Sequence, residues 1–192
     1  TSPFERYWMD IDLKTWLPNI VLDFHMTKMF DTILLQHTFG NIESWRGILE
    51  EFIVQDAAYS LGADFPICNG AIISLSPIKT VTACEGGLVL LNNNHNADEL
   101  TAYRDSCSRL SELNAILALH YLEKLPEILK RKKQIFDYYN SKLPFEHQTV
   151  LNKSTYGYYG MLLPPGTQNS KFKATGKNVY MVGDVECRVR YE

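Results

Sequence analysis

Residues 55–94 have the sequence QDAAYSLGADFPICNGAIISLSPIKTVTACEGGLVLLNNN. Near its start, the acidic residue Asp56 follows an apolar run. The stretch continues through a strand-like segment at 71–76 to a single lysine, Lys79. A Glu-Gly-Gly turn at 85–87 then leads into a second apolar strand. An acid at a strand end and a lysine among uncharged neighbours are an uncommon combination. Asp56 and Lys79 are therefore the first candidates for functional residues.

The composition is that of an ordinary globular protein and limits the classes of partner. The chain has 192 residues, 45% of them hydrophobic and 21% charged, which is enough for one well-packed core. The net charge of −3 supplies no basic field, so we expect no nucleic-acid partner and no anionic membrane surface. No apolar run approaches the length of a membrane span.

The cysteines and histidines are dispersed rather than clustered. The four cysteines form no CxxC pair, which argues against a zinc site or a disulfide framework and favours a reducing, cytoplasmic location. The five histidines form no ligand pair, so a metal hydrolase is only a weak alternative and we predict no metal. The widely spaced residues are Cys68, Cys84, Cys107 and Cys187, and His25, His37, His95, His120 and His147.

Strands and helices are expected to alternate before the central stretch. A strand at 31–38 is followed by a helical pattern at 43–51 and a second strand at 52–55. Apolar, two-sided strands in this order predict an α/β fold with a mostly parallel, buried sheet. Ligands gather beyond the carboxyl ends of such strands, which is where Asp56 and Ser74 fall.

The second half is predicted to be helical and then antiparallel. The expected helices are 96–106, 111–125 and 127–143, and the expected strands are 156–163 and 185–191. Leu100 and Tyr103 of the first helix are expected to face inward, as is an apolar stripe on the second that includes Leu113 and Ile116. Ser111 is the expected cap of that second helix. Pro126 marks a domain boundary, dividing the chain into residues 1–125 and 126–192.

The central stretch contains the residue types that a pyridoxal phosphate site requires. A lysine that forms an imine must be deprotonated part of the time, and Lys79 has no charged sequence neighbours. The cofactor also needs a carboxylate at its ring nitrogen, hydroxyls at its phosphate and a flat group on its ring. Asp56, Ser74 and Tyr59 can fill these roles in that order. Spacing alone leaves the simpler alternative open: an exposed lysine and a turn-forming aspartate.

The motifs in this region resemble those of the DegT/DnrJ/EryC1/StrS family of sugar aminotransferases. They are DAAYSLGA at 56–63, Ser74-x-Ser76-x-x-Lys79, and EGG at 85–87. Flanking matches are DID at 10–12 with Thr15, HTFG at 37–40, RLSELNA at 109–115 and LEKL at 122–125. The resemblance covers most of residues 7–143 in the right order.

The resemblance implies the fold, the cofactor and the partners. It implies the type I aminotransferase fold: a mostly parallel sheet flanked by helices, plus part of a smaller α+β C-terminal domain. It also implies a pyridoxal-phosphate-dependent homodimer that moves an amino group, from glutamate, to a keto sugar linked to a nucleotide.

Roles follow position by position from the resemblance. Lys79 resembles the Schiff-base lysine, Asp56 the ring-nitrogen carboxylate, and Ser74 a phosphate ligand. Tyr59 occupies the place of a ring-stacking histidine or glutamine. Some relatives carry histidine in place of the lysine and dehydrate the sugar, so Lys79 argues against that branch.

The chain departs from the family pattern at loops and termini. It is short between Glu51 and Phe52, at residues 64–70 and at residues 105–109, where a Gly-x-Asn segment is missing. We expect it to be the ordered part of a longer protein, with both domains incomplete, or else a genuinely short protein. Two alternatives to the aminotransferase remain: another type I pyridoxal phosphate enzyme, or a non-catalytic remnant of the fold.

Overall fold

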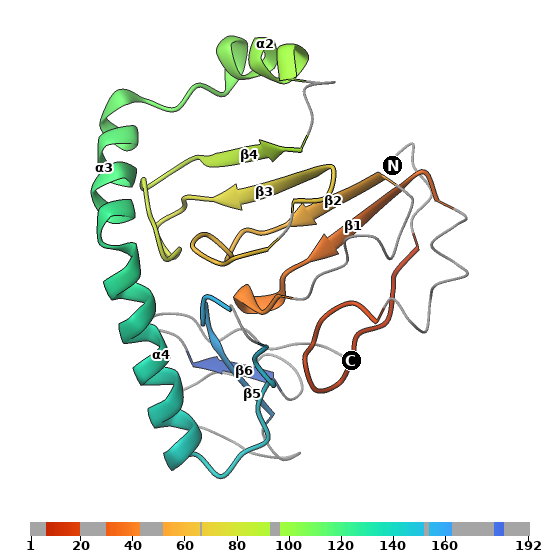
Figure 1. Ribbon diagram of the computed structural model, residues 1–192, viewed down its shortest axis with the longest axis vertical. Helices are drawn as coiled ribbons and strands as arrows, with labels where there is room; N and C mark the ends of the chain where they lie inside the picture. The colour runs from red at the N-terminus through yellow and green to blue at the C-terminus, as the bar shows by residue number, and fades with distance from the viewer. Residues whose placement is uncertain are drawn as a thin grey trace.

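The computed structural model describes residues 7–19, 30–42, 52–65, 67–92, 97–151, 154–162 and 179–182. The strands are β1 (Thr32–Gln36), β2 (Phe52–Asp56), β3 (Gly70–Ser74), β4 (Gly87–Leu91), β5 (Tyr159–Leu162) and β6 (Val179–Val182). The helices are the 3-10 turn η1 (Thr38–Gly40), α2 (Ala97–Cys107), α3 (Glu112–Glu123) and α4 (Leu125–Lys142). Figure 1 shows the four-stranded sheet with α3 and α4 along one side and the β5–β6 ribbon beneath it.

The main sheet has the order β1-β2-β3-β4. β1, β2 and β3 run parallel, and β4 returns antiparallel to β3. The prediction of a mostly parallel sheet is therefore confirmed. Its inner face packs Ile33, Leu35 and Ile53 around Leu17 from the N-terminal segment. Burying these branched side chains removes apolar surface from water and so holds the sheet to that segment.

The outer face of the sheet differs from the prediction of two-sided burial. β1 alternates exposed and buried residues, with Leu34 61% exposed. Val89 of β4 is 58% exposed on the same face, because the register aligns the alternate residues of successive strands. The apolar content of these strands thus overstates how much of the sheet is buried in this chain.

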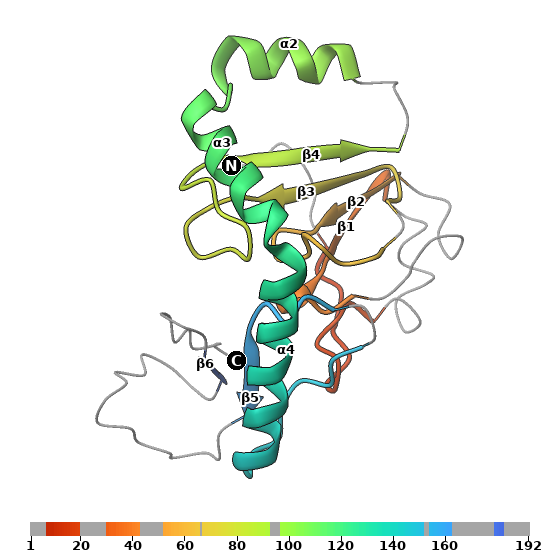
Figure 2. The ribbon, with the colours of Figure 1, turned by 60° about the vertical axis from the view of Figure 1, so that its left-hand side comes forward.

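Helix α3 begins at its predicted cap but turns a different face inward. The Ser111 hydroxyl accepts a hydrogen bond from the Asn114 backbone N–H at 3.2 Å, satisfying one of the free donors of the first turn. Ala118 is the buried residue, and it packs with Leu75 and Val81 of the loop after β3. Leu113 is 76% exposed and Ile116 is 64% exposed, so the predicted inward direction of these two residues is wrong. Figure 2 shows α4 continuing on from α3, with α2 at the opposite end.

Helix α2 forms where it is expected but buries none of its side chains. The predicted inward direction of Leu100 and Tyr103 is wrong, since Tyr103 is 64% exposed. Acids in the first turn and Arg104 in the last turn suit the helix dipole, which explains how an exposed helix forms here.

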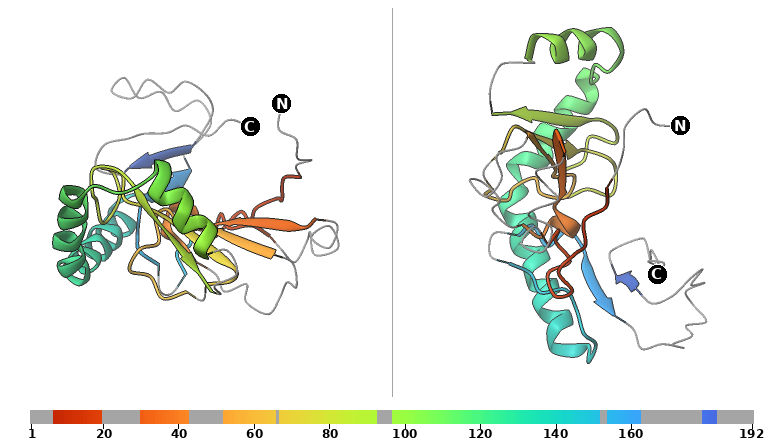
Figure 3. Two further views of the ribbon diagram at one scale, coloured as in Figure 1. Left: turned by 90° about the horizontal axis from the view of Figure 1, so that it is seen from above. Right: turned by 90° about the vertical axis from the view of Figure 1, so that its right-hand side faces the viewer.

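The C-terminal part packs on α4. Phe136 of α4 contacts Tyr159 and Met161 of β5, and β5 pairs with β6 in antiparallel orientation. Strand β6 is not anticipated from the sequence. Seen from above, α3 and α4 lie to one side of the main sheet (Figure 3). The predicted helix at 43–51 and the predicted strand at 185–191 both fall entirely outside the described residues.

A close approach at Gly40 joins the first strand to the C-terminal part. Gly40 has a φ of +80°, and a Cβ there would clash with Thr155 Oγ1 and lie 2.9 Å from the Tyr59 carbonyl oxygen. The Gly40 carbonyl accepts from the Thr155 N–H at 3.1 Å and from the Ser154 hydroxyl at 2.6 Å. Any side chain at this position would be strained and would push these segments apart.

Replacing Gly40 should therefore destabilise the fold. Gly40→Ala is expected to lower the free energy of unfolding by about 2–3 kcal/mol, because it combines an unfavourable φ with a steric clash. Denaturant unfolding followed by circular dichroism measures the change. Gly70→Ala is the matched control, since a Cβ there meets its nearest atom, the Leu90 carbonyl oxygen, at 3.4 Å. Equal losses in the two variants would contradict the assignment of strain to Gly40.

Candidate active site

Asp56 and Ser74 lie at the carboxyl edge of the parallel strands. Asp56 ends β2 and Ser74 ends β3. Asp56 pairs with Ile72, two residues before Ser74. Side chains alternate between the faces of a sheet with a period of two, so Asp56 and Ser74 share one face. The predicted placement of these two residues at one sheet edge is confirmed by the topology.

The Asp56 carboxylate is held by the turn that follows it. Its Oδ1 accepts from the Ala58 backbone N–H at 3.1 Å, and its backbone carbonyl accepts from the His37 N–H at 2.9 Å. The next N–H, of Ala57, donates to the Ile72 carbonyl at 2.9 Å. These bonds fix the residue to both neighbouring strands while leaving Oδ2 without a hydrogen bond to any described residue.

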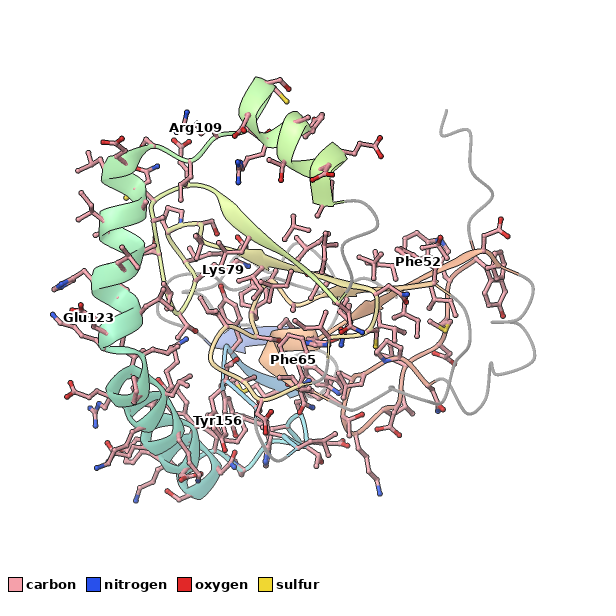
Figure 4. The ribbon with its side chains drawn as sticks, turned by 45° about the horizontal axis from the view of Figure 1, so that its top comes forward. Phe52, Phe65, Lys79, Arg109, Glu123 and Tyr156 are labelled. Atoms are coloured by element: carbon pink, nitrogen blue, oxygen red, sulfur yellow. The ribbon has the colours of Figure 1, made fainter. Side chains whose placement is uncertain are left out.

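Lys79 and Tyr59 are brought into direct contact. Lys79 lies on the loop between β3 and β4, where its N–H donates to the Ser76 carbonyl at 3.0 Å (Figure 4). Its Nζ lies 3.2 Å from the centroid of the Tyr59 ring. An ammonium over an aromatic face is attracted by the ring quadrupole. Within the described part of the chain, Lys79 and Asp56 form no ion pair with each other.

The end of β3 presents two hydroxyl groups and a backbone donor. Ser74 Oγ donates to Ser76 Oγ at 3.3 Å and accepts from the Ser76 N–H at the same distance. Both side chains are half-buried. Hydroxyl and N–H groups converging at a strand end are the donors that phosphate oxygens require. Ser76 therefore joins Ser74 as a candidate ligand.

A C-terminal segment completes the surroundings of Tyr59. Thr155 Oγ1 donates to the Tyr59 carbonyl at 2.5 Å, and the Tyr158 ring meets the Tyr59 ring edge-on with 5.0 Å between centroids. The Gly157 N–H donates to the Phe39 carbonyl at 3.0 Å. Sequence reasoning did not identify these residues as part of the site. The only signal was the tyrosine-rich composition of 156–163, which does not reveal its tertiary partner.

His37 lies behind this site, fully buried. Its Nδ1 is 3.0 Å from Ser60 Oγ and its Nε2 is 3.3 Å from Gln55 Nε2. The Phe65 ring packs edge-on against it at 4.7 Å between centroids. Burial lowers the pKa of His37 from its ordinary value to about 4, because the charged imidazolium would lose its hydration. The histidine is therefore neutral at pH 7.

Two kinds of feature are absent from the described residues. They contain no group of three or more histidine, cysteine, aspartate or glutamate side chains able to hold a metal ion. They also contain no helix that is both long enough and apolar enough to span a bilayer.

Comparison with solved structures defines the class of fold. A DegT DnrJ EryC1 StrS aminotransferase from Brucella abortus superposes with a TM-score of 0.70 at 20% identity, covering 82% of this chain and 53% of that one. GDP-4-keto-6-deoxy-D-mannose-3-dehydratase of E. coli, solved with bound hydrated PLP, gives 0.67 at 16% identity, covering 83% and 54%. The chain thus has the type I aminotransferase fold.

The family follows from the sequence match. The model of the DegT/DnrJ/EryC1/StrS aminotransferase family matches residues 5–155, and the chain belongs to this family. A curated relative is the UDP-4-amino-4,6-dideoxy-N-acetyl-beta-L-altrosamine transaminase of Campylobacter jejuni, 25% identical over 142 residues. That match covers 59% of this chain and 38% of the relative. The chain spans about half the length of the structures it resembles.

The buried His37 should make stability depend on pH. The unfolded chain binds a proton near pH 6.5 and the folded chain only near pH 4, so the unfolded state binds more protons between those values. Stability contributed by His37 should therefore fall as the pH falls, by about 2 kcal/mol between about pH 7 and pH 5. Urea unfolding at the two pH values measures the difference.

Two variants assign this pH dependence to His37. His37→Asn should flatten the profile because it removes the titrating group, whereas the exposed His120→Asn should leave the wild-type slope intact. A His37→Asn protein with the same slope as the wild type would show that another group titrates.

Proposed function

We propose that this chain holds the cofactor of a pyridoxal-phosphate-dependent sugar aminotransferase. The reaction moves an amino group, from glutamate, to a keto sugar linked to a nucleotide. The observation that carries the proposal is the Lys79 ammonium lying 3.2 Å from the centre of the Tyr59 ring. Beside it, Asp56 and Ser74 share a face at the carboxyl edge of the sheet.

The donor set fits pyridoxal phosphate. The Asp56 carboxylate, tied down at Oδ1 alone, can accept from the protonated ring nitrogen. The Ser76 hydroxyl can donate to the phosphate, and so can the Ser74 hydroxyl once its proton turns away from Ser76 Oγ. The flat face of Tyr59 can stack on the cofactor ring once Lys79 Nζ, which lies 3.2 Å from the ring centroid, moves off that face. Since Lys79 is not paired with Asp56, its Nζ would be able to hold the cofactor while the carboxylate would serve the ring nitrogen.

The residues have distinct parts in amino transfer. Bound pyridoxal phosphate supplies a ring that withdraws electrons from the bond to be broken at the donor's α-carbon. Asp56 keeps the ring nitrogen protonated, which strengthens that withdrawal. Lys79 Nζ, once free as an amine, takes the proton from the α-carbon and returns one later as a general acid. A lysine rather than a histidine at position 79 favours transamination over dehydration.

The name of a relative supports the proposed substrate class. The Campylobacter jejuni relative is named as a transaminase of a UDP-linked amino sugar, which supports a nucleotide-linked sugar as the substrate here. We further propose that the protein acts as a homodimer in the cytoplasm. The proposed organisation is an incomplete cofactor domain at residues 1–125 and part of a smaller domain at 126–192.

Binding of the cofactor tests the proposal directly. After incubation with pyridoxal phosphate and removal of the excess, the wild-type protein should show a visible absorbance band, and borohydride should abolish it. Lys79→Ala should lack the band because no other amine occupies that position. Lys130→Ala, which removes an exposed lysine of α4, should retain it. A colourless wild type, or a band that survives in Lys79→Ala, would contradict the assignment.

A half-reaction separates an enzyme from a non-catalytic remnant. Glutamate added to the reconstituted protein should bleach the visible band as the amino group moves to the cofactor, and 2-oxoglutarate should restore the band. Asp56→Asn should bind the cofactor but bleach at least about tenfold more slowly, because the ring nitrogen is no longer held protonated. A stable band that does not respond to any amino donor would favour the remnant.

A further inference from the structure

Three polar side chains are enclosed directly behind the proposed site. His37 and Gln55 are each 1% exposed, and Ser60 is fully buried. His37 follows β1 and Gln55 lies in β2, on the face of the sheet opposite to Asp56. Buried polar groups are normally retained with their hydrogen bonds satisfied, because an unsatisfied one costs free energy. The bonding partners of these groups fix the direction of each hydrogen bond.

The backbone fixes the orientation of the Gln55 amide. Gln55 Oε1 accepts from the Cys68 backbone N–H at 2.9 Å, and an N–H can bond only to the oxygen end. The Gln55 nitrogen therefore faces His37 Nε2, at 3.3 Å, and donates to it. His37 Nε2 is then the unprotonated ring nitrogen. The proton of the neutral ring belongs on Nδ1, which donates to Ser60 Oγ at 3.0 Å.

Each member of the group is linked to a proposed cofactor residue. Gln55 precedes Asp56 and Ser60 follows Tyr59 in the chain. The His37 N–H also donates to the Asp56 carbonyl at 2.9 Å. The turn between Asp56 and Tyr59 closes with a bond from the Ser60 N–H to the Ala57 carbonyl at 2.8 Å. His37 is therefore bonded to both ends of the turn that separates the two cofactor residues.

We propose that His37, as a neutral imidazole protonated on Nδ1, is a positioning residue for the cofactor site. By holding Gln55 and Ser60, it sets the spacing between the Asp56 carboxylate and the Tyr59 ring. We use the term brace for the hydrogen bonds that join His37 to Gln55, to Ser60 and to the Asp56 carbonyl. The role of His37 toward the cofactor rests on the proposed function, whereas the brace does not. Burial keeps the ring neutral at pH 7, so that Nε2 can accept while Nδ1 donates.

The tautomer can be measured without any cofactor. Nitrogen-15 NMR of histidine-labelled protein should give His37 a protonated Nδ1 and an unprotonated Nε2. His37→Asn retains a donor near the position of Nδ1, whereas His37→Gln retains a polar group only near Nε2. In hydrogen exchange, the amides of Ser60 and Ala63 should exchange at least about tenfold faster in His37→Gln and Ser60→Ala than in the wild type. His37→Asn should restore most of the protection.

Measurements on the bound cofactor distinguish a positioning role of His37 from a role in stability alone. His37→Gln and Ser60→Ala should each weaken pyridoxal phosphate binding about tenfold. In each variant the induced circular dichroism of the bound cofactor should also differ from that in the wild type. Phe136→Leu is the control, because the ring contacts of Phe136, with His147, Tyr156 and Tyr159, include none of the proposed cofactor residues. It should lower the denaturation midpoint but leave the affinity and the dichroism unchanged.

The outcomes separate the two proposals. A proton on Nε2, or exchange in Ser60→Ala that matches the wild type, would overturn the brace whatever the cofactor does. Unchanged affinity and dichroism in both variants, with a cofactor-binding wild type, would overturn the positioning role. Failure of the wild type to bind pyridoxal phosphate would remove the proposed function and with it the positioning role, while NMR and exchange would still decide the brace.

Discussion

The parallel register of β1, β2 and β3 is the constraint on which the rest of the site depends. Parallel strands end at the same edge, so His37, Asp56 and Ser74 come together although 37 residues separate the first from the last. The loop that holds Lys79 leaves β3 at this edge, and β4 returns from it antiparallel to β3. Slipping one strand by one residue would move its side chains to the opposite face. The site would then lose either its carboxylate or its hydroxyls.

Side-chain amides fasten distant segments to this edge. Asn41 Nδ2 donates to the Thr15 and Thr149 carbonyls at 2.9 Å each, and its Oδ1 accepts from the Leu151 N–H at 2.8 Å. Gln148 adds a bond to the same Thr15 carbonyl at 2.7 Å. Since Asn41 and Gln148 are both buried, every one of these bonds replaces a bond to water that folding removed. The network holds the C-terminal segment where Thr155 and Tyr158 meet Tyr59.

Local sequence patterns predict the helices and strands better than they predict the tertiary contacts between them. β1 to β4 and α2 to α4 follow from apolar runs, caps and turns, which act within a few residues. Which face of α3 turns inward could not be predicted, because that helix is apolar around most of its circumference and its hydrophobic pattern does not define a direction. The contact between Tyr59 and Tyr158 depends on tertiary packing across 99 residues of chain. The family motifs predict a role for Lys79, but only the tertiary structure places its Nζ on the Tyr59 ring.

The alternation of a β-strand explains how neighbouring residues serve different purposes. Gln55 and Asp56 are adjacent in β2, yet one points into the core and the other toward the proposed cofactor. The inward residue can be locked by hydrogen bonds because it is shielded from water. The outward residue keeps a carboxylate oxygen free because its strongest restraints act on its backbone. A side chain locked by hydrogen bonds has few groups left to bind a ligand. Here Gln55 is locked by its hydrogen bonds, while its neighbour Asp56 keeps an oxygen available for a ligand. Ser60 and Tyr59 repeat this division one turn later, and His37 connects the two inward members.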